Sequence, residues 1–173
     1  MKIPPTNIVK GKNTRRKPET GDIFAFQLEQ FPNRFYFGRV VATDTTIGNM
    51  PGEVILIYVY KNFSSEKNNI PLFSPFELLV PPIGTNALPW THGYFEVVKS
   101  SRNEDSDLLS QHCFFGPPII KGGQPRYFDE YSRRLPSPVE PMGIYGLSGM
   151  GAIDDDISKA LGIPAKPDSD SLR

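Results

Sequence analysis

The sequence has little cysteine and no apolar run long enough to cross a membrane. Its single cysteine, Cys113, excludes an intramolecular disulfide and favours a reducing compartment. The longest apolar run, residues 54–60, has the length of a strand, whereas a membrane helix needs roughly 20 residues. No apolar segment follows the basic residues near the N-terminus, so we expect no signal peptide. These absences predict a cytoplasmic protein that does not contact a membrane.

The chain also lacks an excess of either charge, because 19 Lys and Arg residues balance 19 Asp and Glu residues. A neutral chain argues against a dedicated nucleic-acid-binding protein, which usually carries a basic excess. Basic residues nevertheless cluster near the N-terminus, at Lys10, Lys12, Arg15, Arg16 and Lys17. We interpret residues 1–20 as a flexible basic arm, and favour a solvated tail over an arm that binds nucleic acid or an acidic partner.

Proline is frequent, with 18 residues, and its distribution excludes long helical bundles. Phe24, Phe26 and Leu28 alternate as in a strand, and residues 35–41 follow as a second strand, which predicts an antiparallel hairpin. Residues 54–60 are apolar on both faces, so we place them inside the sheet. The pattern predicts a mainly β fold of the α+β class, either an antiparallel meander or an SH3-like partial barrel.

The second half of the chain predicts shorter elements. We expect strands at residues 94–98, 113–115 and 126–131. For residues 74–80, one helical turn with a capping box and a short strand at 78–80 remain as alternatives. We interpret residues 143–151 as a flexible loop, because four glycines fall within them.

One helix is expected near the C-terminus. Ile153, Ile157 and Leu161 recur at helical spacing, and the acidic run of Asp154, Asp155 and Asp156 is placed in the first turn, where it suits the helix dipole. The globular domain is therefore expected over residues 21–163, and residues 164–173 are expected to be a frayed tail.

Residues that could carry catalysis or bind a metal are few. Two histidines and one cysteine do not show zinc-ligand spacing. His112 precedes Cys113 directly, and neighbouring side chains of a strand point to opposite faces, which disfavours a thiolate pair. We expect no catalytic, metal-binding or cofactor-binding residues and therefore no enzyme. A small hydrolase that uses Cys113 or a carboxylate pair is kept as an alternative, with Glu96, Asp129 and Glu130 as the carboxylates.

An aromatic cluster around His92 offers candidate partner contacts. Tryptophan and tyrosine are frequent anchors of protein interfaces. Trp90 follows a proline in an expected loop and is predicted to be partly exposed, whereas Phe95 is assigned to the core.

Several segments, taken in order, resemble the immunity protein 26 family. They are GDIFAF at 21–26, YFGRV at 36–40, LLVPP at 78–82, WTHGY at 90–94 and the helix at 153–161. Gln27 departs from the family pattern, which often has proline there. The resemblance implies a protein that binds and inhibits a toxin encoded beside it, often a nuclease, and it supplies no catalytic residues.

These observations lead to the hypothesis of inhibition by occlusion of a cognate protein toxin. The predicted partner-binding residues are Tyr36, Arg39, Trp90, His92, Tyr94, Asp154, Asp155 and Asp156. If the toxin is a nuclease, acidic side chains, among them Glu104, Asp105 and Asp107, could mimic phosphates. A nucleic-acid-binding SH3-like module that uses the basic arm remains an alternative, and the oligomeric state is left open.

Overall fold

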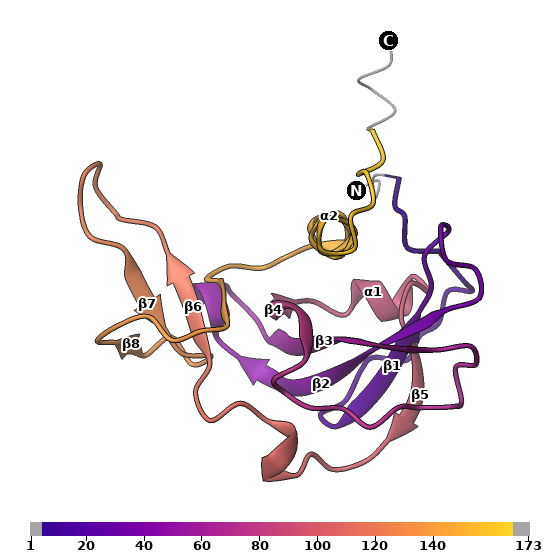
Figure 1. Cartoon of the computed structure of the whole chain (residues 1–173). Coiled ribbons are helices and arrows are strands. Elements are labelled where there is room, and N and C mark those ends of the chain that lie inside the picture. Colours follow the sequence, from indigo (N-terminus) through magenta and orange to yellow (C-terminus); the bar gives the residue numbers. More distant parts are fainter. Residues whose placement is uncertain (1–4, 168–173) are drawn as a thin grey trace.

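The larger of two β-sheets has five antiparallel strands in the order β4-β3-β2-β1-β5 (Figure 1). The computed structural model describes residues 5–167. The five strands are β1 (Asp22–Phe26), β2 (Phe35–Thr45), β3 (Val54–Ser64), β4 (Leu78–Thr85) and β5 (Glu96–Ser100). The predicted hairpin and antiparallel meander are confirmed in β1 to β4. The SH3-like barrel stays a prediction.

Strand β3 lies between β2 and β4 and is buried from Val54 to Tyr60, as its apolar run predicts. Strand β4 resolves the alternative left open at residues 74–80, because Leu78 begins a strand and no helix forms there. This strand continues through Pro81 and Pro82. Proline lacks a backbone N–H, so it is tolerated here because β4 lies at the edge of the sheet.

A smaller sheet, in the order β8-β7-β6-β9, projects from one end of the larger one (Figure 1). Its strands are β6 (Cys113–Gly116), β7 (Arg126–Phe128), β8 (Arg134–Leu135) and β9 (Met142–Ile144). Strands β6 and β9 are parallel. The expected strand at 126–131 therefore ends at Phe128, and part of the segment expected to be a loop at 143–151 is a strand. Residue 143 in this strand is a glycine, because the backbone of β4 passes too close to it for a side chain.

Short helices connect the strands. Helix α1 (Leu88–Thr91) joins β4 to β5, and the 3-10 helices η1 (Ile47–Asn49) and η2 (Asp105–Asp107) follow β2 and β5. Within residues 5–167, no helix combines the length and the apolar character that a bilayer crossing requires.

Helix α2 (Met150–Ala160) packs against the larger sheet beside β4 (Figure 1). Ile153 and Ile157 are buried in the main core, as their spacing predicts. The predicted start is wrong by one turn: Gly149 is the extended N-cap and Met150 is buried, so the helix begins before the acidic run. Burial of the Met150 side chain gives this extra turn its apolar contacts, and the three aspartates fall in the second turn.

Two core clusters cover opposite faces of the larger sheet. One contains Phe24, Leu28 and Trp90 together with the apolar side of α2. The other contains Leu56 and Tyr58 with Phe114 of the smaller sheet. Helix α2 and the smaller sheet are thus attached to the same five strands from different sides.

The N-terminal segment contacts the domain at its described end. Ile8 is buried, and the backbone N–H of Val9 donates to the carbonyl of Gln27 at 2.9 Å. Residues 5–9 therefore have a fixed place, in contrast to the flexible arm expected for residues 1–20, whereas Lys10 to Lys17 are exposed. Residues 1–4 of that arm and 168–173 of the expected frayed tail lie outside the described residues.

Candidate functional site

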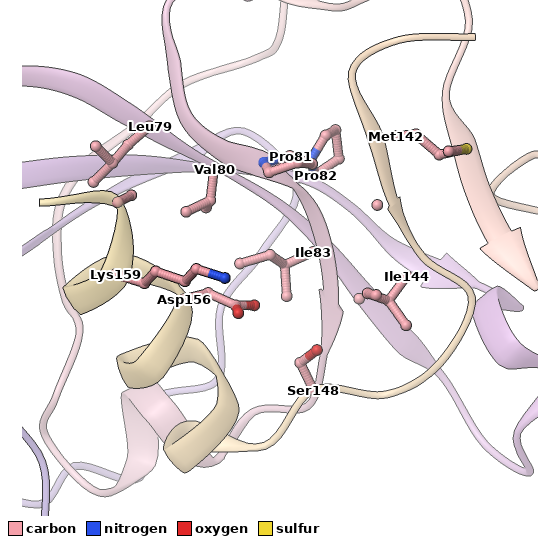
Figure 2. Close-up of a pocket in the computed structure, with 13 residues that line it drawn as sticks. Leu79, Val80, Pro81, Pro82, Ile83, Met142, Ile144, Ser148, Asp156 and Lys159 are labelled. Carbon is pink, nitrogen blue, oxygen red and sulfur yellow. The ribbon is translucent and has the colours of Figure 1, made fainter. Parts of the chain in front are cut away.

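A groove of about 460 Å³ lies between α2, the edge strand β4 and the segment that carries β9 (Figure 2). Val80 and Ile83 of β4 form an apolar floor, and Met142 and Ile144 form the wall on the β9 side. Ile144 is 65% exposed, which leaves a large apolar side chain open to solvent at the mouth of the groove. An apolar depression with an exposed isoleucine at its rim can bury an apolar side chain of a partner.

Hydrogen bonds to β4 hold the segment that follows β9 in place. The backbone N–H of Ser148 donates to the carbonyl of Gly84 at 2.8 Å, and the hydroxyl of Thr85 donates to the Ser148 carbonyl at 2.7 Å. At Gly143 a Cβ atom would lie 2.3 Å from the carbonyl oxygen of Pro82, so only glycine permits this approach. The groove is therefore preformed.

Among the described residues, the charged side chains that line the groove come from α2. Figure 2 shows Asp156 and Lys159 projecting from the helix toward Val80 and Ile83. Desolvation raises the pKa of the Asp156 carboxyl above its ordinary value, and the neighbouring Asp155 adds to this effect, whereas Lys159 opposes it. The groove thus combines an apolar floor with one acidic and one basic group.

The three aspartates of α2 lie in two different environments. Asp155 and Asp156 are exposed, whereas Asp154 is buried. The carboxylate of Asp154 accepts the backbone N–H of Asn7 at 3.0 Å and that of Ile8 at 2.7 Å. Burial raises the pKa of Asp154, and these two hydrogen bonds act in the opposite direction. Asp154 fastens the N-terminal segment, and Asp155 and Asp156 remain accessible to a partner.

Most of the aromatic residues proposed as partner contacts lie in the core. Tyr36, Trp90 and Tyr94 are buried, and His92 is half-buried. The prediction of partial exposure for Trp90 is wrong, since its side chain is 1% exposed. Its proline neighbour occupies the first turn of α1, and this helix places the indole against the rings of Phe24 and Phe95. Phe95 is buried, as predicted.

Arg39, another of the predicted partner contacts, is buried. Its Nε donates to the hydroxyl of Tyr60 and its Nη1 to the side-chain carbonyl of Asn103, both at 3.0 Å. Its Nη2 lies 3.3 Å from the carboxylate of Asp107. These contacts tie β2 to the loop around η2, and they also occupy Asp107, one of the acids considered as a phosphate mimic.

The residues of the hydrolase alternative are each engaged elsewhere. Cys113 is 0% exposed, and its sulfur accepts the backbone N–H of Val139 at 3.5 Å. The candidate carboxylates lie next to cations or a histidine: Glu96 pairs with Lys67, Asp129 with Arg133, and Glu130 with His112. Within residues 5–167, no group of three His, Cys, Asp or Glu side chains is placed to hold a metal ion.

No sequence pattern connects β4, β9 and α2 into one groove. A signal exists only for β4, where two prolines in an apolar segment indicate an exposed strand edge. Ile144 lies in a glycine-rich stretch that reads as a loop, so its place at the groove mouth follows only from the pairing of β9 with β6.

Comparison with known proteins identifies a family. The family model described as Immunity protein 26 matches residues 19–121, which run from the start of the larger sheet past β6. No curated protein and no solved structure matches the chain.

Proposed function

We propose that this chain, which belongs to the immunity protein 26 family, binds a cognate protein toxin and neutralises it by occlusion. The family match carries the proposal. It covers β1 to β6, and therefore includes β4, the floor of the groove.

We further propose that the toxin docks in this groove. Its apolar floor and the exposed Ile144 suit an apolar anchor residue, which is the usual centre of a tight protein interface. The β4 floor lies inside the family match, whereas the β9 wall and α2 lie outside it. This division suits a site in which a shared strand is combined with a wall that is particular to one toxin.

The acidic residues of α2 suit a toxin whose active surface is basic, as that of a nuclease is. Asp155 and Asp156 are exposed beside the groove, where they can attract cationic side chains and speed association. We therefore propose that the toxin is a nuclease and that these two carboxylates face its nucleic-acid-binding surface.

The first experiment is a pull-down of the tagged protein from its native cells, with the bound proteins identified by mass spectrometry. We expect one stoichiometric partner that carries a toxin domain. Expression of that partner in a sensitive host should be toxic, and co-expression of this chain should restore growth. Recovery of nucleic acid in place of a protein, or failure to restore growth, would contradict the proposed function.

Two variants test the site with the captured toxin. Ile144→Asp should weaken binding about 30-fold, the loss expected of an interface anchor. Ile120→Asp is the matched control, because Ile120 is 71% exposed on the connection between β6 and β7. The pair Asp155→Asn and Asp156→Asn should slow association at low salt about threefold or more, and Asp105→Asn, in η2, should not. Equal affinities and rates in all variants would exclude the groove.

A further inference from the structure

A second pocket, of about 410 Å³, lies on another part of the chain, between the N-terminal segment and the turn after α1. Lys12, Thr14 and Arg16 line one side of it, and Trp90 and Phe95 line the other. None of these residues belongs to the groove between α2 and β4.

The pocket has fixed walls. The backbone N–H of Gly11 donates to the carbonyl of Gly93 at 2.8 Å, and that of Thr14 donates to the carbonyl of Thr91 at 2.9 Å. Gly93 has a φ of +83°, and a Cβ atom there would lie 2.4 Å from the carbonyl oxygen of Lys12. Gly93 is therefore required both by its backbone conformation and by the close approach of the basic segment.

The indole of Trp90 has an unsatisfied hydrogen-bond donor. Its Nε1 is buried and has no hydrogen-bond partner among the described residues. A buried N–H without an acceptor costs roughly 1–3 kcal/mol. Trp90 lines the pocket, but its Nε1 is covered by neighbouring atoms, so the indole offers the pocket its ring and not its N–H.

The charges around the pocket favour an anion. Lys12 and Arg16 both line it, and Arg16 is only partly occupied, with its Nη2 2.9 Å from the hydroxyl of Ser100 and 3.7 Å from the carboxylate of Asp22. The one acid of the lining, Glu96, is already paired with Lys67 at 3.0 Å. Lys10, Arg15 and Lys17 add further positive charge on the exposed segment.

We propose that this pocket binds the carboxylate of an Asp or Glu side chain from an acidic segment of the protein partner. Lys12 and Arg16 supply charge-assisted contacts to the two carboxylate oxygens. The inference rests on the proposed function only in assigning that segment to the toxin. An acidic protein segment fits better than a nucleic acid, because bases stack on exposed rings, whereas Trp90 is enclosed by Phe24 and Phe95 at centroid distances of 5.2 Å.

Trp90 is the only tryptophan of the chain, so its fluorescence reports on the pocket directly. We would titrate the full chain with a hexaglutamate peptide and follow the emission. The proposal expects a saturable change with one site, weakened by salt. The double variant Lys12→Gln and Arg16→Gln should bind about tenfold more weakly. The matched control is Lys61→Gln with Lys121→Gln, two exposed lysines outside the pocket, which should bind as the wild type does.

Several outcomes would overturn the proposal: no saturable change up to millimolar peptide, equal binding of hexaglutamine, equal binding by the Lys12 and Arg16 variant, or tighter binding of a single-stranded oligonucleotide than of the peptide. The titration contains no toxin, so its failure removes the pocket and leaves the proposed function intact. If the titration succeeds but growth rescue fails, the pocket binds acidic segments and the chain does not neutralise a toxin.

Discussion

Gly38 shows how closely β2 approaches its neighbours. A Cβ atom at this position would lie 2.2 Å from the ring of Phe24 and 2.5 Å from the carbonyl oxygen of Tyr58. Both neighbours are fully buried, so neither can move without disturbing the core. A glycine inside a strand is typical of a bulge or of such a close backbone approach.

Substitution of Gly38 by alanine should therefore destabilise the fold. We expect the free energy of unfolding to fall by roughly 3 kcal/mol, the upper part of the range for overpacked cores. Urea denaturation followed by circular dichroism measures this change. Gly146→Ala is the control, because nothing lies within 4 Å of a Cβ atom at Gly146. A similar loss in both variants would show that the crowding at Gly38 is not the cause.

The environment of a single residue could be predicted where the local sequence pattern determines it. The alternation in β1 identifies Phe24, Phe26 and Leu28 as core residues, and all three are buried together. The prediction was wrong where a segment distant in sequence determines the environment of a residue. Trp90 is buried by the rings of Phe24, on β1, and Phe95, just before β5, and Asp154 is buried by the backbone of residues far away in the chain. Neither contact leaves a local pattern.

At the scale of elements, a chain of hydrogen bonds links the two sheets. The hydroxyl of Tyr58, on β3, lies 2.6 Å from Nε2 of His112, and Nδ1 of His112 lies 3.2 Å from the carboxylate of Glu130, after β7. The backbone N–H of Leu109 already donates to the Tyr58 oxygen. The phenol hydrogen is thus free to point at Nε2, which places the imidazole proton on Nδ1, facing Glu130. Burial raises the pKa of Tyr58, so the phenol keeps this proton.

Glu130 makes this link sensitive to pH. Burial alone would raise its pKa, but the hydrogen bond and charge of His112 lower it below the ordinary value of 4.5. Folding therefore favours the ionised carboxyl. Its contribution to stability is present above pH 4.5 and is lost as the pH falls through the lowered pKa.

Glu130→Gln should accordingly reduce the free energy of unfolding by about 1–2 kcal/mol at neutral pH. The difference from the wild type should shrink when denaturation is repeated at pH values falling below 4.5. Glu53→Gln, at an exposed position, serves as the control and should change stability little at any pH. A difference that stays constant over the whole pH range would mean that ionisation of Glu130 does not stabilise the link.

The elements were predicted unequally for a physical reason. The meander of β1 to β4 consists of long segments whose apolar pattern repeats, and its strands pair with their chain neighbours. The smaller sheet consists of strands of two to four residues, and β9 pairs with β6 across a long stretch of chain. Such short strands carry no measurable periodicity. The groove depends on β9, which explains why its position could not be predicted.

At the scale of the whole molecule, the N-terminal segment and α2 hold each other in place. The side chain of Asn7 donates to the hydroxyl of Ser158 at 2.9 Å and to the carbonyl of Pro164 at 3.0 Å. The Asn7 side-chain oxygen accepts a hydrogen bond from Gln30 at 2.8 Å. These contacts join three parts of the chain that are distant in sequence, and they fix the helix that forms one wall of the proposed toxin-binding groove.

Ile8 is the apolar part of this junction, and its truncation should loosen α2. Ile8 is 1% exposed and packs in the same core cluster as Ile153 and Ile157, so Ile8→Ala should lower the free energy of unfolding by roughly 2–4 kcal/mol. In this variant, hydrogen exchange relative to the wild type should accelerate more for the amides of α2 than for those of β3, because local opening releases the helix before the central strand. Val9→Ala is the matched control, since Val9 is 44% exposed and its truncation should cost about 0.5 kcal/mol or less. If α2 and β3 exchange equally faster in Ile8→Ala, the N-terminal segment supports the whole fold and not the groove wall in particular.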